Sequence, residues 1–130
     1  MSNGIQLVSE MTEGEQLASV RAYLKVEEGL EDAIALLNAR KVNFATKETE
    51  LKLIRIELAD FKAELAKVRA RLIAFEAGRL SMKPPSPQVV KDITKLAAKL
   101  DKMVAKAQKA DTIVAATKLL VQALEKTQAA

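Results

Sequence analysis

Residues 51–75 read LKLIRIELADFKAELAKVRARLIAF, and their apolar side chains recur in alternating steps of three and four. This spacing places them along one face of an α-helix, as in the seam of a coiled coil. The seam has a leucine at every first position and consists of Leu51, Ile54, Leu58, Phe61, Leu65, Val68, Leu72 and Phe75. The stretch therefore predicts a long helix that packs one face against another helix.

A second seam follows the prolines at positions 84, 85 and 87. Proline cannot continue a helix, so the leucine-rich helix must end before them, whereas Ser86 followed by Pro87 is a typical helix start. The same spacing then runs through Val89, Ile93, Leu96, Leu100, Met103, Ala107, Ala110, Val114, Thr117, Val121 and Leu124. We predict a helix over residues 87–127.

The short connection between the two seams predicts that they pack on each other as antiparallel neighbours. Placing Leu72 opposite Val89 gives layers whose residue numbers add to 161, for example Leu65 with Leu96. Charged residues beside the seams favour this register, because they then face one another with opposite signs. The predicted pairs are Arg71 with Asp92, Glu64 with Lys99 and Glu57 with Lys106.

The first half of the chain predicts one further helix. Thr12 and Glu15 have the spacing of a capping box, so we expect a helix over 13–42 after a loose lead at 1–11. A turn near Asn43 and a helix over 44–80 follow. This helix has a second stripe on which the first can pack, made of Ile56, Ala59, Ala63, Ala66, Ala70, Ile73, Ala77 and Leu80.

The fold class follows from this pattern and from the composition. The 130 residues include only four Gly and three Pro, too few for the frequent turns of a sheet protein. We predict a single all-α domain over 1–130, an elongated antiparallel coiled-coil-like bundle of three long helices. The spacing of three and four residues continues through Asn43 without interruption. The alternative is therefore one helix over 13–80 and a second over 87–127, with two chains dimerising as a four-helix bundle.

The residue types available argue against an enzyme. The chain has no Cys, His or Trp, and no glycine-rich phosphate loop. The acidic residues Glu27, Glu28, Glu31 and Asp32 lie at helical spacing, but a di-iron site of this kind also needs histidine, so we interpret them as a solvated face. We predict no catalytic, cofactor-binding or metal site.

Lysines form a stripe on the helix predicted after the prolines, and such a stripe could bind phosphates. The register assigns Lys99 and Lys106 to pairs within the chain, which leaves Lys91, Lys95, Lys102 and Lys109 as candidate ligands for an anion or a nucleic acid. No aromatic residue is interleaved for base stacking, and the net charge is only +4. We therefore place nucleic-acid binding second among the possible functions.

The end of the last predicted helix is apolar nearly all round, and one neighbouring helix cannot cover it. We predict self-association there, as a homodimer, through Ile113, Ala116, Leu119, Leu120 and Ala123. The leading expectation is a cytoplasmic helical assembly, adaptor or scaffold protein that binds other protein. It has no segment long enough for membrane insertion.

Overall fold

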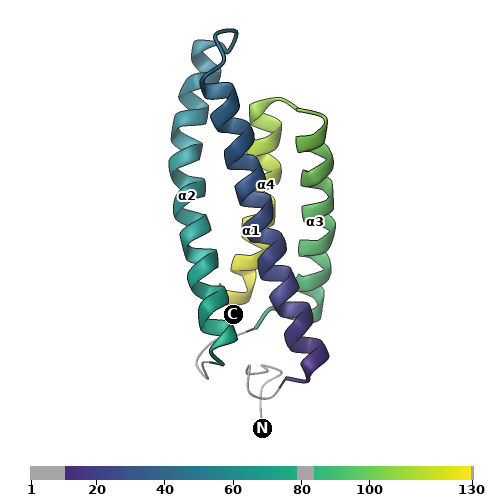
Figure 1. Ribbon diagram of the computed structural model, residues 1–130. Coiled ribbons are helices and arrows are strands. Elements are labelled where there is room, and N and C mark those ends of the chain that lie inside the picture. Colours follow the sequence, from purple (N-terminus) through teal and green to yellow (C-terminus); the bar gives the residue numbers. More distant parts are fainter. Residues whose placement is uncertain (1–10, 79–83, 130) are drawn as a thin grey trace.

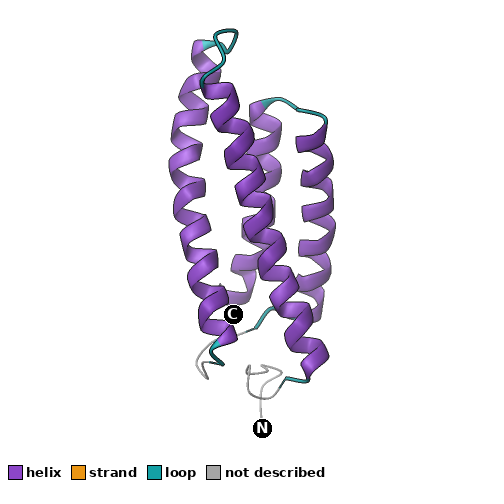
Figure 2. Cartoon of the chain, viewed as in Figure 1, coloured by secondary structure: helices purple, strands orange, loops and turns teal. Residues whose placement is uncertain are grey.

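The computed structural model describes residues 11–78 and 84–129, and these form four α-helices and no strand (Figures 1 and 2). The helices are α1 (Glu13–Lys41), α2 (Glu48–Glu76), α3 (Pro87–Ala105) and α4 (Ala110–Ala129). The all-α prediction is confirmed. The prediction of three long helices is wrong, because the last one is divided into α3 and α4. The predicted lead at 1–11 lies almost wholly outside the described residues.

Two helix starts lie where the sequence predicts them. The Glu15 amide donates to Thr12 Oγ1 at 3.1 Å, and the Thr12 amide donates to Glu15 Oε1 at 3.2 Å, which completes the capping box of α1. Ser86 Oγ accepts from the Val89 amide at 3.2 Å, with Pro87 at the first position of α3. Both starts are fixed by residues within one turn, which explains why the local sequence predicts them.

The turn near Asn43 is also present, so the alternative of one helix over 13–80 is wrong. Asn43 Oδ1 accepts from the Ala45 amide at 2.8 Å, and Thr46 Oγ1 donates to the Arg40 carbonyl oxygen at 2.7 Å. These side-chain bonds replace helical ones and reverse the chain. The next helix therefore begins at Glu48 rather than 44. Its predicted last residues, 79 and 80, lie outside the described part of the chain.

The predicted helix over 87–127 is interrupted at residues 106–109. The Ala107 amide donates to the Val104 carbonyl and the Gln108 amide to the Met103 carbonyl, which is the Schellman arrangement at a helix end. Ala107 has a φ of 49°, in the left-handed region that glycine usually occupies there. Because alanine fills this position, the sequence carries no signal for the break.

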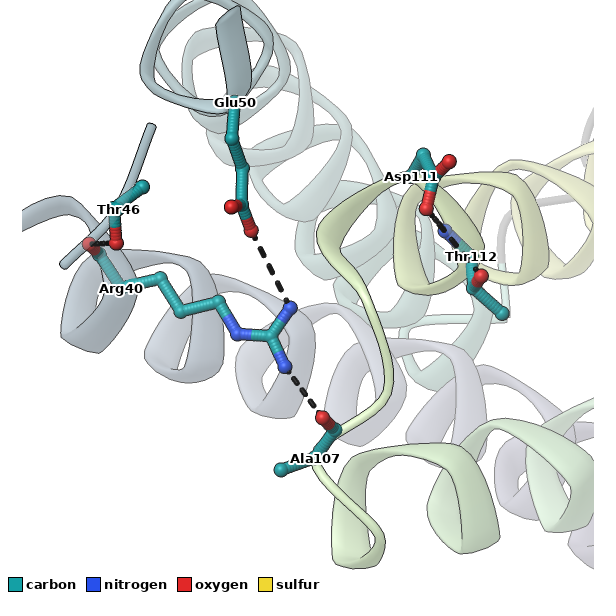
Figure 3. Close-up of polar contacts among 6 residues, drawn as sticks. All are labelled: Arg40, Thr46, Glu50, Ala107, Asp111 and Thr112. Atoms are coloured by element: carbon teal, nitrogen blue, oxygen red, sulfur yellow. Dashed lines mark hydrogen bonds and ion pairs between the residues drawn. The ribbon is translucent and has the colours of Figure 1, made fainter. Parts of the chain in front are cut away.

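Arg40 connects this break to the α1–α2 turn, which lies at the same end of the bundle (Figure 3). Its Nη2 donates to the Ala107 carbonyl oxygen at 2.6 Å, and its Nη1 lies 3.6 Å from Glu50 Oε1. The arginine thus connects the α1–α2 turn, the start of α2 and the α3–α4 turn at one end of the bundle. The longer α1–α2 hairpin projects beyond the α3–α4 hairpin at this end (Figure 1).

The helices are arranged differently from the predicted register. In Figure 1, α2 and α3 lie on opposite sides, with α1 and α4 between them, and each outer helix packs mainly against α1 and α4. The layers summing to 161 are therefore wrong. Within the described residues the predicted ion pairs do not form: Glu57 lies 2.9 Å from Lys118, and Glu64 lies 3.4 Å from Lys67.

The core nevertheless contains most of the predicted seam residues, because α2, α3 and α4 direct them inward. In α2, every seam residue from Ile54 to Phe75 is buried. In α1, the buried residues include Tyr23, Val26, Leu30, Ala33 and Leu37. The alanine stripe is not used as predicted: Ile56 is 62% and Ile73 67% exposed. The first helix instead shares the leucine side of α2 with α4.

Candidate functional site

A groove runs between α3 and α4 on the surface of the bundle. It consists of two adjoining hollows of about 390 and 290 Å³, and Leu96 and Leu119 line both. Its apolar lining is completed by Met103, Ala115, Ala116 and Ala123. Leu119 is 50% exposed, although the neighbouring Leu120 is buried in the core. We call this surface the α3–α4 groove.

Charged side chains line the edges of the α3–α4 groove. Lys95 and Lys99 come from α3 and Lys126 from α4, and none of the three forms an ion pair within the described residues. Of the two acidic lining residues, Asp92 accepts from Gln88 Nε2 at 3.0 Å. Asp111 accepts from the Thr112 amide at 2.8 Å (Figure 3). The groove therefore combines an apolar floor with three lysines that form no ion pair among the described residues and two aspartates, a net charge of +1.

The structure divides the predicted lysine stripe. Lys91, Lys95 and Lys102 are exposed on α3, as the helical spacing requires, but Lys109 lies beyond the end of that helix. Lys109 lines a different hollow, of about 280 Å³, beside Arg40 and the α1–α2 turn. Lys99, which the wrong register assigned to Glu64, is exposed at the groove instead. Its place at the groove was not predicted, because it depends on the packing of α3 against α4.

The residues predicted for self-association separate into core and surface. Ile113 and Leu120 are fully buried, and Ala116 and Ala123 are nearly so, within a single chain. Only Leu119 of the five is exposed. The predicted register gives this helix one neighbour, whereas α4 packs against α1, α2 and α3. These three neighbours cover the apolar surface for which a second chain was invoked.

The acidic residues of α1 make an interhelical contact. Arg69 of α2 places Nε 3.4 Å from Glu27 Oε2 and Nη2 3.1 Å from Glu31 Oε1. Burial, followed by the negative charges of neighbouring carboxylates, raises the pKa of Asp32 above its ordinary value. Those neighbours are Glu28, Asp101 and Glu31. In the part of the chain that is described, no three acidic side chains gather closely enough to hold a metal ion.

The only tyrosine in the sequence belongs to the core. Tyr23 is fully buried, its ring centroid lies 5.7 Å from that of Phe75, and its hydroxyl has no hydrogen-bond partner. Burial raises its pKa to about 12, against a smaller lowering by Arg71. A phenol held neutral in an apolar core has no access to a substrate, so Tyr23 has a packing role.

Comparison of the chain with protein-family models, with curated proteins and with solved structures gave no match. Among the described residues, no helix has the length and apolar character needed to cross a lipid bilayer. The described residues thus form a four-helix, all-α fold.

Proposed function

We propose that this protein is a non-enzymatic helical adaptor or scaffold that binds another protein through the α3–α4 groove. The observation that carries the proposal is the half-exposed Leu119 in an apolar groove flanked by unpaired Lys95, Lys99 and Lys126. Apolar grooves between helices commonly receive the apolar face of an amphipathic helix, and charges at the rim select its flanks. The partner segment is therefore a helix with acidic flanks.

The dimensions of the groove fit such a partner. Its lining residues on α3 extend from Asp92 to Met103, about 16 Å at about 1.5 Å per residue, which corresponds to three helical turns. An amphipathic helix presents three or four apolar side chains to a groove in every two turns. Leu96, Met103 and Leu119 offer matching contacts.

A synthetic amphipathic peptide tests this proposal. The peptide has leucines at steps of three and four with glutamates on both flanks, and its binding is measured by fluorescence anisotropy. Leu119→Asp should weaken binding by about tenfold or more, because it places a charge at the centre of the interface. Leu17→Asp is the matched control, since Leu17 is also 50% exposed but lies on α1. Equal binding by both variants, or none by the wild type, contradicts the proposal.

Self-association forms a narrower part of the proposal. Of the residues predicted for a homodimer, Leu119 alone is exposed, so a dimer of this kind has to bury the α3–α4 groove. Light scattering across a concentration series should then give a dimer mass for the wild type and a monomer mass for Leu119→Asp. A wild-type monomer at all concentrations would exclude the dimer but leave peptide binding to be judged separately.

Nucleic-acid binding is the second candidate. It is supported by Lys91, Lys95, Lys99 and Lys102, which are exposed along one side of α3 and make no ion pair with any described residue. Binding through phosphates weakens steeply with salt. Duplex and single-stranded DNA should bind at low salt and lose affinity in a Lys91→Glu, Lys102→Glu variant but not in Lys52→Glu, an exposed lysine of α2. No binding at low salt ends this alternative.

A further inference from the structure

The α1–α2 turn presents its apolar side chains to solvent. Phe44 is fully exposed and Val42 is 77% exposed, so they are the two most exposed large apolar side chains among the described residues. The hollow of about 280 Å³ beside this turn is lined by Asn43, Ala45 and Thr46, but neither Val42 nor Phe44 lines it. The polar and small residues of the turn therefore face the α3–α4 hairpin, and its large apolar residues face outward.

Hydrogen bonds hold the turn in this conformation. The Asn43 amide donates to the Arg40 carbonyl oxygen at 3.1 Å, and the Thr46 amide donates to the Asn43 carbonyl oxygen at 3.1 Å. The side chains of Asn43 and Thr46 add the two bonds described above, so Val42 and Phe44 cannot turn inward without breaking them. Because the α1–α2 hairpin projects beyond its neighbour, this turn is the first part of this end to meet a partner (Figure 1).

The same end of the bundle carries most of the net positive charge. The α1–α2 and α3–α4 turns, with the helical turns next to them, comprise residues 38–51 and 102–113 and hold six basic and three acidic side chains. Their net charge is +3, whereas that of the whole chain is +4. Lys41, Lys47, Lys106 and Lys109 are exposed there, and none of them forms an ion pair with a described residue. Positive charge and exposed apolar surface therefore occur together.

The shape of this end selects the kind of partner. Apolar side chains on a projecting turn are buried only by a partner that closes around them. A lipid surface does so without a preformed pocket, and its affinity increases with the apolar area buried and with the attraction between basic side chains and anionic headgroups. Lysine also keeps its ammonium group among the headgroups while its methylene groups follow the apolar residues inward.

We propose that the α1–α2 turn docks this protein on an anionic lipid surface. Val42 and Phe44 enter the boundary between headgroups and acyl chains, and the exposed lysines of the two turns lie at the headgroups. The bundle then stands with this end on the lipid. The α3–α4 groove, which lies along the side of the bundle, stays open to a protein partner.

Cosedimentation with lipid vesicles tests the role of Phe44. The wild type should bind vesicles of equal parts phosphatidylcholine and phosphatidylserine, bind pure phosphatidylcholine far more weakly, and lose affinity as salt is added. Phe44→Ala should weaken binding to the anionic vesicles by about tenfold, because it removes the largest apolar group from the contact. Ile73→Ala is the matched control, since Ile73 is 67% exposed but lies at the far end of α2.

The lysines are tested on the same anionic vesicles. Lys41→Gln and Lys47→Gln should each weaken binding by about fivefold, the contribution of one basic side chain near an anionic surface. Lys25→Gln, an exposed lysine of α1 far from the turn, is the matched control and should bind like the wild type.

Phe44→Trp tests insertion directly, because the sequence has no tryptophan and the new side chain supplies the only indole fluorescence. Its emission should shift to shorter wavelength when anionic vesicles are added, whereas that of Ile73→Trp should not. Circular dichroism checks that each variant is folded, which we expect because the replaced side chains are exposed.

Three outcomes overturn the proposal: no binding of the wild type to anionic vesicles, equal losses in Phe44→Ala and Ile73→Ala, or no spectral shift in Phe44→Trp. A wild type that ignores vesicles but binds single-stranded DNA through Phe44 also overturns it, and assigns the turn to base stacking. Leu119→Asp should bind vesicles like the wild type, so this proposal and the adaptor proposal fail independently.

Discussion

A Cβ atom built on Gly29 would lie 2.7 Å from Leu120 Cδ2, so α1 approaches α4 as closely as a glycine allows. The same atom would lie 3.2 Å from Leu100 Cδ2 of α3. Gly29 therefore marks the point where three helices meet in the core, and both leucines there are fully buried. The absence of a side chain at this position permits the contacts that place α1 and α4 at the centre of the bundle.

Gly29→Ala should destabilise the protein. The added methyl forces Leu120 out of its packed position, an overpacking effect of about 1–3 kcal/mol, against about 1 kcal/mol gained from the higher helix propensity of alanine. Gly14→Ala is the control, because its nearest neighbour would be Thr12 Oγ1 at 4.0 Å. Urea unfolding should show a lower midpoint for Gly29→Ala only. A higher midpoint for both variants contradicts close packing at Gly29.

Tyr23→Phe should stabilise the protein by about 1 kcal/mol, because it removes a buried hydroxyl that has no partner. The pKa of Tyr23 in the folded state, about 12, lies above the ordinary value of 10.0. The unfolded chain thus loses this proton first, and stability falls as pH rises from 10 towards 12 in the wild type but less in Tyr23→Phe. Tyrosinate absorbance reports this group alone, and a midpoint near 10 contradicts its burial.

The sequence predicts the parts of this fold that short-range rules determine. Thr12, Ser86 and Pro87 act on their own helix ends, so the starts of α1 and α3 follow from a few neighbouring residues. The spacing of the α2 seam likewise identifies its buried face. The same spacing does not specify which helix covers that face, since leucines at steps of three and four pack equally on α1, α3 or α4. The predicted pairing of α2 with α3 failed for this reason.

The candidate site was predictable only in its components. Lys95 and Leu119 both belonged to predicted surfaces, but these were placed on one continuous helix. The α3–α4 groove that contains both residues exists only because the chain reverses at Ala107, where no glycine or proline signals a turn. Glu57 gave no signal either, because its burial depends on α4 packing beside α2. Tertiary contacts, rather than local sequence, create the α3–α4 groove and bury Glu57.

Ala107→Gly should stabilise the protein by about 1 kcal/mol, since glycine adopts the left-handed conformation without the steric cost that alanine pays. The control is Ala105→Gly at the exposed last residue of α3, which should destabilise by up to about 1 kcal/mol. Thermal unfolding of the two variants should give melting temperatures that move in opposite directions. A lower value for Ala107→Gly would show that residues 106–109 are helical in solution.

Asp32→Asn should raise the melting temperature at neutral pH. Burial and the charges of Glu28, Asp101 and Glu31 raise the pKa of Asp32 in the folded state above the unfolded value of 3.8, so the ionised carboxylate disfavours folding. Lowering the pH through the raised pKa protonates Asp32 in the folded protein first and relieves this repulsion.

The advantage of Asp32→Asn should therefore shrink as the pH falls and vanish below the unfolded pKa. Because the side chain is partly exposed, we expect less than about 1 kcal/mol at neutral pH. Asp60→Asn, on an exposed side of α2, is the control, and an advantage of Asp32→Asn that persists at the lowest pH would show that charge is not its cause.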